Sequence, residues 1–225
     1  MKRLMAVLCA CALLVAMMGV AFAAGSISKP EITGKGEEET ESGWWYEVRD
    51  VNPDAYRIST LKDIVNAVNE EVAVESTESD DTEDTMTVRK AVEAMQSYLP
   101  EGTTLDENGV VTIQAAGADK EDTVIDLNEY DFVTEFKDVV YTNGKEAKYV
   151  NGDGEDATPT LTLTVDALKG ADDLNGYQLM VMHPETGETH FLDLSKDLAK
   201  NAFDSAAGTL KVQFPGLGAF TLIQK

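Results

Sequence analysis

Two histidines flank a short polar segment near the carboxyl end of the chain. His183 and His190 are the only histidines in the sequence, and residues 184–188 between them favour a hairpin turn. A four-residue loop is expected to oppose the two imidazoles directly, with Cβ atoms about 4.5–5.5 Å apart. Together with Glu185 or Glu188, such a pair could hold a divalent metal ion. The alternative is that both histidines are ordinary surface residues of a polar hairpin.

A second group of possible metal ligands lies in the acidic loop at residues 151–156. Asp153 and Glu155 place oxygen ligands at alternate positions, as in a calcium loop. The sixth position is Asp156, where an EF-hand requires glycine, and no bidentate glutamate follows at the twelfth position. The motif is incomplete, so a plain acidic turn is the competing interpretation. Apart from this Ca²⁺ candidate, we expect no cofactor.

Adjacent aromatic residues suggest a different chemistry, namely stacking on a ligand. Trp44, Trp45 and Tyr46 follow one another, and alternation along a strand would send one tryptophan inward and the other outward. An outward Trp44 or Trp45 could stack on a sugar ring. Packing in a hydrophobic core explains the same residues, and both interpretations stay open.

Motifs for catalysis are absent from the sequence. It contains no Gly-x-Ser-x-Gly elbow, P-loop, dinucleotide fingerprint or His-Glu-x-x-His motif. A glycosidase-type carboxylate pair is defined in space and leaves no spacing signature, so 41 acidic residues neither reveal nor exclude one. We therefore predict that the protein is not an enzyme, with a small secreted hydrolase as the alternative.

The first residues have the three parts of a secretory signal peptide. Lys2 and Arg3 precede an apolar stretch that ends in the small-residue pattern at 21–23. Cleavage after residue 23 would remove Cys9 and Cys11, which are the only cysteines in the chain. The mature protein would then have neither disulfides nor thiolate metal sites. A lipoprotein signal is the alternative, but Cys11 lies inside the apolar stretch instead of at its end.

The charge balance limits the possible partners. There are 41 acidic and 18 basic residues, a net charge of −23, and loss of Lys2 and Arg3 with the signal would leave −25. Binding to a phosphate backbone requires clustered cations, and no basic cluster follows residue 3. We expect no nucleic-acid partner, no membrane span after signal cleavage, and a protein or glycan partner at the cell envelope.

Two segments carry helical periodicity. The first has apolar residues at Leu61, Ile64, Val65, Val68 and Val72, behind a Thr60–Asp63 pair that resembles a capping box. The second repeats this spacing from residue 88 to residue 99, begins behind Thr87 and ends at Pro100. The acidic stretch between these segments has no apolar residue to bury, which predicts a loop.

After residue 105 the pattern changes to short β-rich runs separated by turn residues. Five dipeptides with glycine in second place, such as Asn108-Gly109 and Asn143-Gly144, supply the positive φ angles that tight hairpins require. The run Thr160–Val165 alternates threonine with leucine or valine, so one face is apolar and the other is hydroxylated. Many short strands at close spacing predict an antiparallel sandwich.

The pattern of short strands and turns continues in the runs at 179–183, 188–192, 210–214 and 217–222. Over residues 160–225 the order of hydrophobic residues and turns resembles the closing strands of immunoglobulin-like modules in secreted and surface proteins of Gram-positive bacteria. The resemblance implies an extracellular binding or spacer module without catalysis of its own.

Taken together, the sequence predicts an α+β protein with two N-terminal amphipathic helices and a C-terminal antiparallel immunoglobulin-like β-sandwich. The expected divisions are a signal peptide at 1–23, a disordered acidic leader at 24–43, a helical region at 44–104 with an acidic loop at 75–85, and a sandwich domain at 105–225. The expected function is that of an exported, non-catalytic interaction module at the cell surface or in the medium. A spacer or assembly subunit of an envelope complex is the alternative.

Overall fold

A computed structural model of the chain describes residues 30–36, 43–74, 85–115, 121–150, 154, 157–196 and 202–225, with the backbone alone at 71–74. The predicted signal peptide, the acidic stretch 75–84, and the loop residues Asp153 and Glu155 lie outside the described residues.

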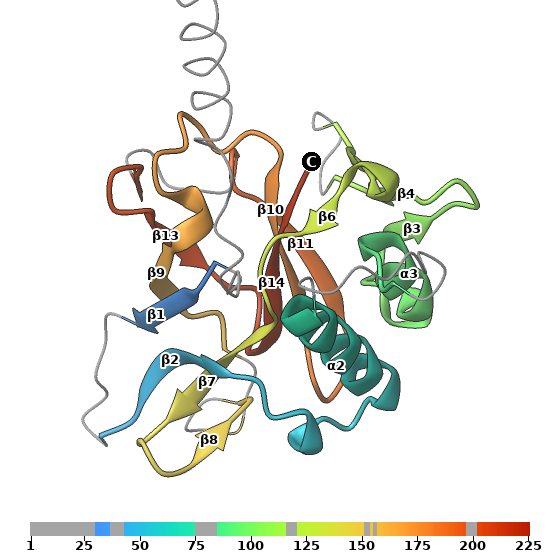
Figure 1. The fold of residues 1–225 in the computed structure, drawn as a ribbon. Helices are drawn as coiled ribbons and strands as arrows, with labels where there is room; N and C mark the ends of the chain where they lie inside the picture. Colours follow the sequence, from blue (N-terminus) through green and yellow to red (C-terminus); the bar gives the residue numbers. More distant parts are fainter. Residues whose placement is uncertain are drawn as a thin grey trace, which may run out of the picture.

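A large antiparallel sheet is the main element of the fold (Figure 1). Among the described residues it contains eleven strands in the order β11-β10-β14-β7-β2-β1-β9-β13-β12, with β6 paired to β14 and β8 paired to β7. Its strands are β1 (Ile32–Gly36), β2 (Trp45–Asp50), β6 (Asp131–Phe132), β7 (Lys137–Thr142), β8 (Ala147–Lys148), β9 (Thr160–Val165), β10 (Tyr177–Met182), β11 (Thr189–Asp193), β12 (Phe203–Asp204), β13 (Thr209–Gln213) and β14 (Gly218–Gln224).

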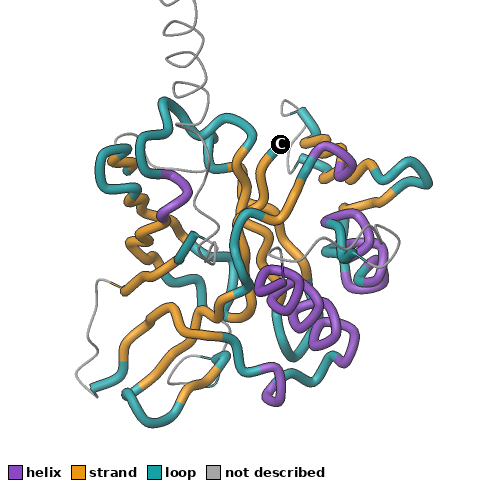
Figure 2. Tube along the Cα trace, in the orientation of Figure 1, coloured by secondary structure: helices purple, strands orange, loops and turns teal. Residues whose placement is uncertain are grey.

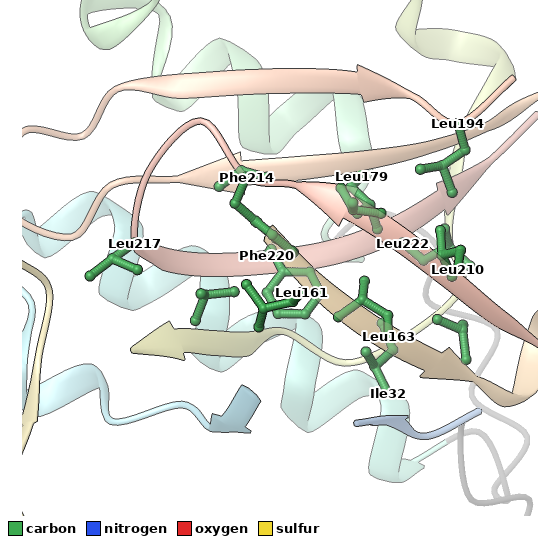
Figure 3. Close-up of a cluster of buried hydrophobic side chains, with 14 of the residues drawn as sticks. Ile32, Leu161, Leu163, Leu179, Leu194, Leu210, Phe214, Leu217, Phe220 and Leu222 are labelled. Atoms are coloured by element: carbon green, nitrogen blue, oxygen red, sulfur yellow. The ribbon is translucent and has the colours of Figure 1, made fainter. Parts of the chain in front are cut away.

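The sheet curls so that its two ends share one hydrophobic core. In β9 the alternating Leu161, Leu163 and Val165 are all 0% exposed, whereas the threonines between them lie on the other face. Figure 3 shows these leucines facing Leu179 of β10 and Phe220 of β14, which come from the opposite part of the sheet. The concave face of the sheet therefore encloses this first core.

A second core covers the convex face of β10 and β14. Helices α2 (Ser59–Val74) and α3 (Val88–Ala94) pack there with a three-stranded sheet of β3 (Thr103–Leu105), β4 (Val110–Ile113) and β5 (Thr123–Asp126), seen on one side of the main sheet in Figures 1 and 2. The short 3-10 helices are η2 (Pro53–Ala55), η3 (Gln96–Tyr98), η4 (Leu127–Glu129) and η5 (Asp166–Leu168). Because both of their faces are covered, β10 and β14 are almost continuously buried.

The helices follow the apolar stripes of their sequences. Leu61, Ile64, Val65 and Val68 of α2 are at most 1% exposed, as the period of 3.6 residues predicts. No helix in the described part of the chain is long and apolar enough to span a membrane.

The predicted fold class is wrong. The chain is mainly β, and one curled sheet replaces the expected two-sheet sandwich. Strands β1 and β2 precede both helices yet lie inside this sheet, where β2 pairs with β7 and β1 pairs with β9. The sheet therefore takes strands from both sides of the boundary expected between residues 104 and 105.

Part of the expected leader is also ordered. Residues Ile32–Gly36 form β1, although the segment 24–43 was expected to be disordered. Ile32 is 2% exposed and belongs to the concave core. Two of the five residues in β1 are glycines, which have low strand propensity, so this segment lacks the β-rich composition of the other strands.

Candidate functional site

The histidine hairpin is formed by β10 and β11, but its register differs from the prediction. His190 pairs with Val181, and the backbone N–H of His183 donates to the carbonyl of Glu188 at 2.9 Å. The expected direct opposition of the two imidazoles is therefore wrong, because a loop of four residues places His183 opposite Glu188. His183 and His190 are diagonal neighbours on the concave face of the sheet.

The ring of His183 is part of the turn. Its Nδ1 accepts backbone N–H groups from Glu185 and Thr186, each at 3.3 Å. This hydrogen bonding assigns the ring proton of the neutral imidazole to Nε2. A metal ion needs a ring nitrogen with a free lone pair, so the turn disfavours His183 as a ligand.

His190 interacts with a carboxylate of its own strand. Its Nε2 lies 3.2 Å from Oε1 of Glu188. Burial lowers the pKa of His190 below its ordinary value of 6.5, and the nearby His183 lowers it further, while Glu188 acts in the opposite direction. The imidazole is therefore held in a setting that favours its neutral form.

A small hollow separates this hairpin from the turn that precedes β14. It has a volume of about 50 Å³ and is lined by Val181, Thr186, Glu188, both histidines, and residues 215–217. Ligand pockets for organic molecules usually measure about 300–1,000 Å³, so this hollow has room only for an ion or a few waters. Among the described residues, no group of three His, Cys, Asp or Glu side chains is arranged to hold a metal. Metal binding at His183 and His190 stays a prediction.

The two tryptophans lie on opposite faces of the sheet, as strand alternation predicts. Trp44 packs against the concave core, where its ring stacks on Tyr141 with centroids 5.1 Å apart. Lys148 Nζ lies 4.5 Å from the centroid of the same ring. Trp44 thus already stacks on Tyr141 and has an ammonium group over its ring, and packing explains its position.

Trp45 begins a row of three side chains along the convex face of β2. Its indole N–H donates to Oε2 of Glu47 at 2.5 Å, and Arg49 Nε donates to the other oxygen of this carboxylate. The three residues are spaced by two, so they share one face of the strand. Glu47 and Arg49 retain side-chain exposures of 17% and 31%, and Trp45 is half-buried. We call Trp45, Glu47 and Arg49 the tryptophan row.

Of this row only Trp45 was a candidate from the sequence; Glu47 and Arg49 were not predicted. The signal was present, because Trp-x-Glu-x-Arg places an aromatic ring, an acceptor and a donor on one strand face. What the sequence could not show was that the carboxylate would bind both neighbours at once.

A buried carboxylate on β7 was also missed. Asp138 is 1% exposed and accepts hydrogen bonds from Tyr56 Oη at 2.6 Å, Tyr149 Oη at 2.7 Å and the backbone N–H of Asn52 at 3.1 Å. Burial raises the pKa of Asp138, and these three donors oppose that shift. Burial, and then the nearby carboxylate, raise the pKa of both tyrosine hydroxyls. Asp138 ties the segment before α2 and the residue after β8 to the sheet, which is a structural role.

Comparison with protein-family models, with curated proteins and with solved structures finds no match for this chain.

Proposed function

We propose that the protein is an exported, non-catalytic interaction module that binds a partner protein at the cell surface or in the medium. The tryptophan row on β2 is the observation that supports this proposal. Export rests on the charged, apolar and small-residue segments that end at residue 23.

The row has the composition of a protein-binding surface. Tryptophan and arginine are enriched among the residues that contribute most to binding energy at interfaces. Here Glu47 holds both side chains in place before any partner arrives, so less side-chain entropy is lost on binding. The row also stands on a strand that pairs with β7 along its whole length, which keeps its backbone rigid.

A protein partner is favoured over a glycan by the surroundings of the two tryptophans. They point to opposite faces, so they cannot enclose one sugar ring together. Trp44 is packed against Tyr141 and Lys148, and the N–H of Trp45 is already bonded to Glu47. What remains for recognition is a partly exposed indole beside a guanidinium group.

The proposal can be tested by affinity capture. Residues 24–225 are immobilised as wild type, as the double variant Trp45→Ala/Arg49→Ala, and as Lys145→Ala, a control at an exposed position in the β7–β8 turn. Thermal unfolding first establishes that all three proteins are folded. Envelope and culture-medium fractions of the producing organism are then passed over each.

We expect one or more proteins to be retained by the wild type and the control and lost with the double variant. Identical profiles from all three proteins would remove the row from the binding surface. Hydrolysis of a panel of chromogenic glycosides and peptides by the wild type would contradict a non-catalytic role.

A further inference from the structure

The pairing between β1 and β2 in the large sheet is incomplete. Strand β1 pairs with β9 along its whole length, from Ile32 opposite Val165 to Gly36 opposite Leu161. Its pairing with β2 is limited to Lys35 opposite Glu47. Continuing that register would place Thr33 opposite Arg49 and Ile32 opposite Asp50, and neither of these pairs forms. The strands are still close at Gly34, where an added Cβ would lie 2.9 Å from Val48 Cγ2, and they separate from there toward Ile32.

An open hollow of about 420 Å³ lies where the missing pairs would be. It is lined by residues 31–33, by residues 48–50 and by Lys137 of β7. Successive residues of a strand point to opposite faces, so three consecutive residues from each strand can line one hollow only at the strand edges. We call this opening between two backbone edges the β1–β2 notch.

The backbone of β1 offers hydrogen-bonding groups to this notch. The carbonyl of Glu31 accepts from the N–H of Asp166, so Glu31 directs its backbone carbonyl toward the β9 side. In an antiparallel ladder the next residue directs its groups to the other side. Ile32 therefore turns its N–H and C=O toward β2, at the level where the pairing with β2 has ended.

The notch is lined by two acidic and two basic side chains, and two further carboxylates, Glu47 and Glu135, lie against the basic pair. Lys137 Nζ lies 2.7 Å from Asp50 and 3.7 Å from Glu135, and Glu31 also contributes to its electrostatic surroundings. One ammonium group thus faces three carboxylates, and the Asp50 side chain is 92% exposed. On the other face Arg49 is paired with Glu47. With a chain charge of −23, the notch favours a cationic occupant.

We infer that the β1–β2 notch receives an extended peptide segment of a partner protein that carries lysine or arginine. The segment adds as a short strand, and its backbone pairs with the free edges of β1 and β2. Its basic side chain lies beside Asp50 and Glu31. This inference rests on the proposed interaction function and names a site for it, since Arg49 belongs to both the tryptophan row and the notch.

A defined probe tests the inference without knowledge of the natural partner. A fluorescein-labelled heptapeptide of alternating valine and lysine is titrated into residues 24–225, and binding is followed by fluorescence anisotropy. Two matched peptides serve as controls: one has glutamate in place of lysine, and the other is the lysine peptide with alternate backbone nitrogens methylated. Methylation removes the donors that a strand ladder needs and leaves the charge unchanged.

We expect the lysine peptide to bind and both control peptides to lose binding. Asp50→Lys should weaken binding by about tenfold or more, whereas Asp172→Lys, the same charge change at an exposed site outside the notch, should have a small effect. Hydrogen exchange should show new protection of the Ile32 amide when the peptide is bound, because that amide gains a partner.

Two outcomes would overturn the inference. Equal binding of the methylated peptide would mean adsorption to an acidic surface without strand addition, and unchanged exchange at Ile32 would place the peptide elsewhere. A peptide that fails to bind, together with partner capture that depends on the tryptophan row, would refute the notch and leave the proposed function intact. Failure of both experiments would refute the proposed function as well.

Discussion

Removing a tyrosine hydroxyl from the buried Asp138 cluster is expected to destabilise the fold in a pH-dependent way. Tyr56 and Tyr149 donate to the two carboxylate oxygens at 2.6 and 2.7 Å, lengths typical of charge-assisted bonds. A hydrogen bond to a charged group contributes about 1.5–3 kcal/mol. Tyr56→Phe should therefore lower the free energy of unfolding by about 1.5–3 kcal/mol, or the melting temperature by about 3–12 °C for a domain of this size.

The direction of the pH dependence follows from the raised pKa of Asp138. The folded state holds this proton more tightly than the unfolded state, so the group contributes most stability at pH values below its ordinary pKa of 3.8. That contribution is lost as the pH rises through the folded pKa. Tyr56→Phe removes a donor that favours the charged form, so it raises the folded pKa further. The deficit of the variant should therefore grow as the pH rises from 3.8 through the raised folded pKa of Asp138.

Urea denaturation followed by tryptophan fluorescence measures this effect for the wild type, Tyr56→Phe and Tyr149→Phe across that pH range. Tyr98→Phe is the matched control, since Tyr98 is only partly buried and lies outside the Asp138 cluster. The lowest pH of the series stays above the isoelectric point of about 4.2, because a protein without net charge tends to precipitate. A deficit that is the same at every pH, or no larger than that of Tyr98→Phe, would refute the reasoning.

Three further predictions follow from local geometry. Asn69→Leu should lower the free energy of unfolding, measured by urea denaturation, by about 2–4 kcal/mol. The reason is that the Asn69 side-chain amide accepts from the N–H of Phe136 at 2.7 Å and donates to its carbonyl at 3.2 Å. Asp63→Ala on the exposed face of α2 is the control and should have little effect. Gly218→Ala should lower the free energy of unfolding by more than about 3 kcal/mol, because the new Cβ would lie 2.5 Å from the Met182 carbonyl oxygen and φ is +146°. Gly43→Ala, where φ is +75° and the space is open, should lower it by about 1 kcal/mol. Equal melting temperatures of the two variants would contradict this prediction. In an NMR titration His190 should have a pKa below 6.5, and Glu188→Gln should lower it further; a rise in the variant would show that Glu188 does not stabilise the imidazolium.

Local elements of the fold could be predicted because their signals are local. The strands β4 and β9 have the expected bounds, Val110–Ile113 and Thr160–Val165, since alternation and flanking turns define both ends. Helix α3 begins behind Thr87, whose hydroxyl accepts from the Lys90 N–H at 3.2 Å, as expected of a capping residue. It ends earlier than predicted, at Ala94, and a 3-10 helix continues to Tyr98.

The start of α2 shows how a neighbouring residue changes a local signal. The Thr60–Asp63 pair predicted a capping box, but the helix begins at Ser59. The N–H of Lys62 donates to the carbonyl of Ile58, which places Thr60 inside the first turn. The backbone of Arg57 and of Ile58 is in turn bonded to the carbonyl of Pro184, far along the chain. The contact with Pro184 therefore lies next to the start of α2, which the Thr60–Asp63 pattern placed one residue too late.

Some features of the candidate sites could be predicted from the sequence, and others depended on the tertiary structure. Opposite faces for Trp44 and Trp45 could be predicted, because alternation depends only on the strand itself. The relative position of His183 and His190 was predicted wrongly although the loop length was right: six residues separate the two histidines, so a loop of four residues pairs His183 with Glu188. The side-chain partners of Asp138 are Tyr56, which is 82 residues away, and Tyr149, which directly follows β8 of the same hairpin, and no spacing rule connects them.

The sequence by itself determined the acidic charge of the chain, the two amphipathic helical segments, most of the short strands, and a cysteine-free chain after residue 11. Only the tertiary structure decided that the sheet curls around one core and that β1 lies between β2 and β9. Gly34 shows the reason: a Cβ there would lie 2.6 Å from Leu163 and 2.9 Å from Val48, so close packing against distant strands requires a residue that local propensity disfavours. Strand partners at long separation are selected by the packing of the whole core, and this selection is not encoded in any single segment.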